Sequence, residues 1–121
     1  MRVKTLSAST ISGNDVKNSK GEHLGHIKDI MINLEDGRIA YAVLSFGGFL
    51  GMGDKLFAIP WNSIRVDQVD KCCVLNVSKE RLENAPGFDK DDWPKTGDPA
   101  YLTRVYEYYK AEPFWKQPET V

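Results

Sequence analysis

The chain has 121 residues, of which 41% are hydrophobic and 27% charged, a composition typical of a folded protein rather than a disordered one. Its formal net charge of −1 and its pI near 6.1 provide no electrostatic basis for nucleic-acid binding, which usually requires a basic face. Its longest apolar run, residues 39–44, is far shorter than the ~20 residues that span a bilayer, and residues 1–10 lack the apolar core of a secretory signal. We therefore expect a cytoplasmic protein without membrane insertion; a membrane-bound partner is compatible with this composition.

Short β-strands account for most of the first two thirds of the sequence. Residues 23–34 alternate between polar and apolar side chains, and the alternation predicts that Ile30, Ile32 and Leu34 lie on one face. Residues 38–46 are almost continuously apolar, which is typical of a strand buried on both faces. Weaker patterns predict further strands at residues 15–17, 55–59, 64–66 and 72–77.

Turn residues separate these strands. Asp36-Gly37 lies between two apolar runs and predicts a hairpin, because glycine tolerates a positive φ. Gly47-Gly48 interrupts the apolar run before it, and Pro60 ends the strand at residues 55–59 because it has no N–H to donate. Five or six short antiparallel strands with tight turns predict a mainly β protein, namely a small β-barrel.

Two helices are expected after the strands. Ser78 is a good N-cap for a short helix over residues 79–84. Asp98 and Pro99 are typical of a helix start, as N-cap and first helical residue. An apolar stripe then predicts an amphipathic C-terminal helix over residues 100–111.

These patterns divide the chain into three parts. Residues 1–10 form an N-terminal arm, residues 11–87 form the β-domain, and residues 88–121 form an acidic linker followed by an aromatic helix. So many aromatic side chains are costly to leave in water. We expect the C-terminal helix to pack on the barrel or on a second subunit.

Several motifs between about Ile11 and Leu82 occur in the order and spacing of a known family. They are Gly21-x-x-x-Gly25-x-Ile27-x-Asp29, Asp36-Gly37-Arg38-Ile39, the glycine-rich residues 46–53 and Ile59-Pro60-Trp61. Through them the chain resembles the PRC-barrel family, which includes the cytoplasmic barrel of the photosynthetic reaction centre H subunit and the C-terminal domain of the bacterial ribosome maturation factor. The resemblance implies a bacterial docking module rather than an enzyme.

The residues themselves form no recognisable catalytic, metal or cofactor pattern. His23 and His26 are three residues apart on a predicted strand, which places them on opposite faces and prevents shared chelation. Cys72 and Cys73 are adjacent and are interpreted as small hydrophobic residues, one facing the core and the other solvent or a neighbour. Residues 48–53 lack the Lys-Ser/Thr that completes a phosphate-binding loop. We therefore predict no catalytic residue, no metal and no cofactor.

Apolar residues in the glycine-rich loop and the tail are the candidate contact residues. Phe49, Leu50 and Met52 lie in a glycine-flanked loop, where exposed apolar side chains are costly unless they are covered. They form either a contact patch or a plug that folds over the end of the barrel. The same two alternatives apply to the aromatic residues of the tail, since aromatic anchors serve interfaces and cores alike. These residues are Tyr101, Tyr108, Phe114 and Trp115.

These observations predict a non-catalytic docking protein that binds a protein partner of unknown identity and associates with itself as a dimer. The contacts would be made through an exposed sheet edge, the glycine-rich loop or the aromatic tail. The alternative is an RNA-associated module similar to the barrel of the ribosome maturation factor, for which binding would be salt-sensitive. The near-zero net charge does not favour that alternative.

Overall fold

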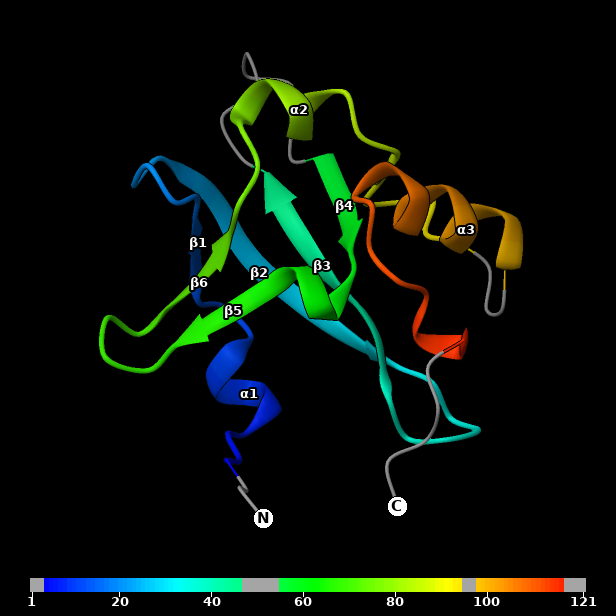
Figure 1. Cartoon of the computed structure of the whole chain (residues 1–121), viewed down its shortest axis with the longest axis horizontal. Coiled ribbons are helices and arrows are strands. Elements are labelled where there is room, and N and C mark those ends of the chain that lie inside the picture. The colour runs from blue at the N-terminus through cyan, green and yellow to red at the C-terminus, as the bar shows by residue number, and fades with distance from the viewer. Residues whose placement is uncertain (1–3, 47–54, 95–97, 117–121) are drawn as a thin grey trace.

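The computed structural model describes residues 4–46, 55–94 and 98–116, and its centre is one curled β-sheet (Figure 1). The strands pair in the order β5-β6-β1-β2-β3-β4-β7. Their bounds are β1 Asp15–Lys17, β2 His23–Ile32, β3 Ile39–Phe46, β4 Lys55–Ile59, β5 Ile64–Asp67, β6 Cys72–Leu75 and β7 Gly87–Asp89. The helical elements are α1 Ala8–Ile11, α2 Lys79–Glu83 and α3 Pro99–Tyr108, with 3-10 turns η1 Trp61–Ser63 and η2 Phe114–Lys116.

The predicted mainly β fold with a C-terminal helix is confirmed, but three details differ. The sheet has seven strands instead of five or six, and it is not closed: in the described residues, β5 and β7 are its two edges. It is also mixed, because β6 runs parallel to β1. The sequence missed β7 because its pairing with β4 uses backbone groups and shows no apolar alternation in residues 87–89.

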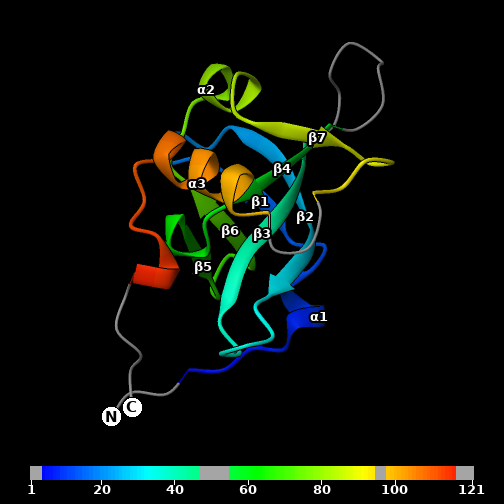
Figure 2. The ribbon, with the colours of Figure 1, turned by 90° about the vertical axis from the view of Figure 1, so that its right-hand side faces the viewer.

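Strand β3 lies between two apolar clusters, as its continuous apolar sequence predicted. Ala42, Leu44 and Phe46 belong to the cluster inside the curled sheet. Tyr41 and Val43 belong to a second cluster on the outer face, together with residues of β4 and α3. Figure 2 shows α3 lying against this outer face of β3 and β4.

Strand β2 departs from regular alternation because its pairing with β3 shifts register twice, between Ile27 and Asp29 and again between Met31 and Ile32. The extra residue is Lys28 of β2 in the first shift and Ala40 of β3 in the second. Ile30, Ile32 and Leu34, which are predicted to share one face, have different surroundings. Ile30 packs against the inner cluster, whereas Ile32 and Leu34 are 53% and 92% exposed.

The helix boundaries follow from local hydrogen bonds. Ser78 and Asp98 cap α2 and α3 as predicted, each with a side-chain oxygen that accepts a backbone N–H. Helix α3 ends at Tyr108 rather than at residue 111, because Lys110 adopts a φ of +54° and the Ala111 N–H donates to the Tyr106 carbonyl. At the other end of the chain, the predicted N-terminal arm leads into α1, which begins at Ala8 and whose Ile11 is buried in the inner cluster.

Gly25 of β2 lies close against the backbone of β3. Its φ is +150°, and a Cβ atom built at this position would lie 2.0 Å from the Ser45 carbonyl oxygen. No side chain fits at that distance, and the carbonyl belongs to β3, an interior strand of the sheet. The glycine in the Gly21-x-x-x-Gly25 motif is therefore required by backbone packing.

We predict that Gly25→Ala lowers the free energy of unfolding by at least about 3 kcal/mol, because β2 and β3 must move apart. Gly13→Ala is the matched control: Gly13 also has a positive φ, +92°, but no heavy atom beyond its own residue and its two chain neighbours lies within 4 Å of its Cβ position. Backbone strain alone should cost it about 1–2 kcal/mol. Denaturant unfolding measures both, and equal losses would contradict the proposed clash.

Candidate functional site

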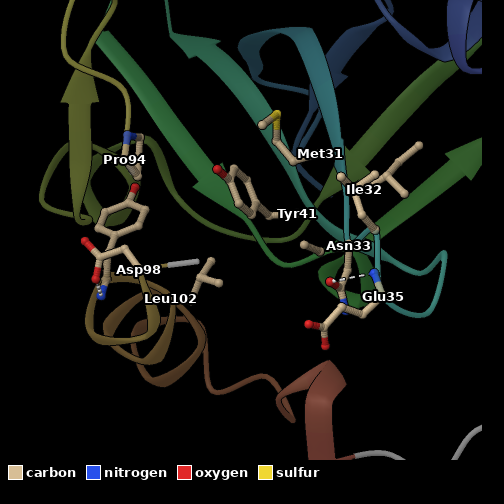
Figure 3. A pocket seen from close by; sticks show the side chains of 11 residues that line it. Met31, Ile32, Asn33, Glu35, Tyr41, Pro94, Asp98 and Leu102 are labelled. Carbon is tan, nitrogen blue, oxygen red and sulfur yellow. Dashed lines mark hydrogen bonds between the residues drawn. The ribbon is translucent and has the colours of Figure 1, made fainter. Parts of the chain in front are cut away.

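An apolar groove with a volume of about 550 Å³ lies between the β2–β3 hairpin and the beginning of α3. Figure 3 shows Met31, Ile32 and Glu35 on the hairpin side and Asp98 and Leu102 on the α3 side. The groove is lined by Met31, Ile32, Asn33, Leu34, Glu35, Ala40, Tyr41, Pro94, Asp98, Tyr101 and Leu102. Its walls therefore come from segments that are distant in the sequence.

The hairpin wall is held by a network of short-range hydrogen bonds. The Asn33 side-chain amide donates to the Asp36 carboxylate at 2.9 Å, and the same carboxylate oxygen accepts the Arg38 backbone N–H at 3.0 Å. Gly37 completes the predicted turn with a φ of +74°. The exposed Leu34 is thus presented by an ordered turn, which reduces the entropy that a binding partner must remove.

The α3 wall is positioned by the helix cap and by aromatic packing. The Asp98 carboxylate accepts the Tyr101 backbone N–H at 3.1 Å. The Tyr101 ring packs edge-on against Phe88, and its hydroxyl donates to the Pro86 carbonyl at 3.3 Å. Tyr101 is consequently buried, and the partly exposed Leu102 is the α3 side chain that extends the groove.

Among the residues that the structure describes, the charged residues that line the groove are both acidic. Glu35 and Asp98 stand on opposite walls, and Tyr41 lies between them with its hydroxyl. Burial raises the pKa of Tyr41 above its usual value of 10.0, so the hydroxyl stays protonated. The groove thus combines apolar walls with two carboxylates and a neutral hydroxyl.

The structure places the predicted contact residues in different environments. Phe49, Leu50 and Met52 lie outside the described residues. Tyr101 is buried in the outer cluster, Tyr108 and Phe114 are half-buried, and Trp115 is 42% exposed. The structure therefore brings these tail aromatics onto the chain's own sheet and its covering residues, and their role as contacts with another protein stays a prediction.

Hydrogen bonds attach the C-terminal tail to the rest of the fold. The Tyr106 hydroxyl donates to the Ala40 carbonyl at 2.5 Å, and Arg38 Nη1 donates to the Phe114 carbonyl at 2.8 Å. Arg81 and Tyr108 exchange two hydrogen bonds: the guanidinium donates to the Tyr108 carbonyl, and the Tyr108 hydroxyl donates to the Arg81 carbonyl. The guanidinium also lies 4.3 Å from the Tyr108 ring centre. Such a cation–π contact adds to the attachment.

Titratable residues elsewhere do not form a metal site. Within residues 4–46, 55–94 and 98–116, no three His, Cys, Asp or Glu side chains are close enough to bind a metal ion. His23 lies 3.4 Å from Asp15 in an exposed pair. Cys72 and Cys73 are both free and buried, so neither side chain faces solvent. From the sequence, we expect one of them to face either solvent or a neighbour. Burial raises the pKa of the Cys73 thiol.

Sequence reasoning missed the groove because its hairpin wall depends on the second register shift. The alternation in the sequence puts Ile32 and Leu34 on the same face as Ile30. The signal that could have placed them outside is their position next to the Asp36-Gly37 turn.

None of the described helices is long and apolar enough to cross a membrane.

A comparison with protein families found that the model of the PRC-barrel domain matches residues 4–82 of the chain. The match includes β1 to β6 and most of α2, and it ends before β7 and α3. No curated protein sequence matches the chain.

Removing the buried hydroxyls of Tyr106 and Tyr109 should change the free energy of unfolding by different amounts. We predict that Tyr106→Phe lowers the free energy of unfolding by about 1–2 kcal/mol, because a buried hydrogen bond to Ala40 is lost. The Tyr109 hydroxyl is buried without a hydrogen-bond partner among the described residues. Tyr109→Phe should therefore be neutral or stabilising in the same denaturant titration, and an equal loss in both variants would contradict this assignment.

We also predict that alkali weakens the fold between pH 10 and pH 12. Burial raises the pKa of Tyr101 and Tyr106 to about 12, and it raises the pKa of Tyr109 as well. Above pH 10 the unfolded chain releases tyrosine protons that the folded chain retains, so the free energy of unfolding falls as pH rises; below pH 10 these tyrosines leave it unchanged. Denaturant unfolding at a series of pH values measures the slope. Tyr106→Phe should make it shallower, and a flat profile would contradict the prediction.

Proposed function

The chain belongs to the PRC-barrel family, and we propose that it acts as a non-catalytic docking module that binds a protein partner and a second copy of itself. The observation that carries this proposal is the apolar groove with the exposed Ile32 and Leu34 at its edge. Exposed apolar residues are ordinary when scattered singly. Here they adjoin a concave apolar surface, which is the usual character of a contact site.

The hydrogen-bonded turn of the β2–β3 hairpin supports docking through a surface that is already formed before the partner binds. Leu34 follows directly on Asn33, whose side chain is bonded to the turn, so its backbone is already in place before a partner arrives. A partner that covers this edge removes apolar surface from water at little ordering cost. RNA association is not supported at this site, since the charged lining residues in the described part of the chain, Glu35 and Asp98, are carboxylates that would repel phosphates.

We predict that Leu34→Asp reduces self-association and leaves the fold intact, because Leu34 is 92% exposed and contributes little to the core. Val69→Asp is the matched control: Val69 is 91% exposed but lies in the turn between β5 and β6, outside the groove lining. The molar mass by light scattering should fall to that of a monomer for Leu34→Asp alone, with unchanged thermal unfolding of both variants. An unchanged mass for Leu34→Asp, or equal effects of the two substitutions, would refute the groove as the contact face.

A further inference from the structure

Three of the exposed large apolar side chains lie at one end of the molecule. Leu34 and Ile32 belong to the end of the β2–β3 hairpin, and Leu6, which is 41% exposed, precedes α1. Leu6 adjoins Ile39 at the start of β3. Figures 1 and 2 both place the segment before α1 and the hairpin end at the same end of the sheet. Leu6 therefore lies at the same end of the molecule as the exposed edge of the groove.

The segment before α1 is complementary in charge to the groove. Lys4 is exposed, Arg2 precedes it in the sequence, and there is no Asp or Glu before Asp15. The groove presents Glu35 and Asp98 and no basic lining residue in the described part of the chain. A short segment carrying a cation and an apolar side chain, such as Lys4 and Leu6, matches both its charge and its apolar walls.

The segment does not fill the groove of its own chain. Lys4, Thr5 and Leu6 line a separate depression, together with Ile39 and Trp61. Ile11, which lines the same depression, belongs to the inner cluster, whereas Ala40 and Tyr41 of the groove belong to the outer cluster. The chain's own segment and the groove therefore adjoin different clusters, and residues 4–7 do not occupy the groove of their own chain.

We propose that residues 4–7 of a second copy occupy the groove, with Lys4 facing Glu35 and Asp98 and with Leu6 covering the apolar walls beside Leu34. This assignment rests on the proposed docking function and names the partner segment. Because each copy carries both the segment and the groove, the exchange is reciprocal in a two-fold dimer, and each pair of copies contains two identical contacts.

The experiment measures the dimer dissociation constant of the full chain by analytical ultracentrifugation. Lys4→Glu places negative groups together in each contact and Glu35→Lys places positive groups together, so each variant alone should dimerise about tenfold more weakly or worse. Both side chains are exposed, so neither substitution disturbs the core. Glu107→Lys, at an exposed carboxylate of α3 outside the groove lining, is the control and should match the original chain.

Mixing the two weakened variants, Lys4→Glu and Glu35→Lys, is the decisive step. In a mixed dimer one contact sets the two substituted positions against each other, a new carboxylate facing a new ammonium group, and the other contact keeps the original Lys4 and Glu35. Both contacts are then attractive, so dimerisation should recover to near its original strength. No recovery on mixing, or a dimer insensitive to Lys4→Glu, would overturn the assignment of the segment.

The other outcomes separate this assignment from the docking function on which it rests. If a dimer insensitive to Lys4→Glu is nevertheless lost in Leu34→Asp, docking through the groove stands and only its occupant is wrong. A monomeric original chain would overturn self-association and this assignment together.

Discussion

The burial of β3 on both faces is the constraint on which the rest of the structure depends. A strand whose side chains are apolar on both faces needs an apolar layer on each side, since exposing either would cost the free energy gained by burial. The curled sheet supplies the inner layer around Leu44 and Phe57. Helix α3 supplies the outer one through Val105 and Tyr106. The curled sheet and the tail together cover this one strand.

The tail is therefore part of the fold although the family match ends at residue 82. Its apolar contacts are joined by hydrogen bonds in which one partner is a backbone carbonyl, as in Tyr106 to Ala40 and Arg38 to Phe114. The bond from Tyr106 to Ala40 places the helix along β3, because the Ala40 carbonyl has one position on the strand, whereas apolar contact alone allows sliding. The position of α3 in turn determines where its N-cap, Asp98, stands opposite the hairpin.

The groove arises where this regular packing ends. The second register shift leaves Ala40 of β3 without a partner in β2, and Ala40 and Tyr41 both line the groove beside the exposed Ile32. Met31 and Tyr41 lie between the hairpin and the helix. Both side chains pack in the outer cluster, and both also line the groove. A bulge that would be a defect in a uniform sheet here produces a concave apolar surface with a carboxylate on each wall.

Features that depend on neighbouring residues could be predicted from the sequence. The Asp36-Gly37 turn, the Ser78 and Asp98 caps and the buried β3 are each specified within a few residues, because one turn, one cap or one apolar run is enough to favour them. The motif spacing likewise indicated the family. Only the tertiary structure decided the register of β2 against β3, the pairing of β7, the parallel β1–β6 pair and the groove. These depend on which backbone groups meet across the sheet, and a hydrogen bond between distant strands leaves no periodic trace in the side chains that flank it.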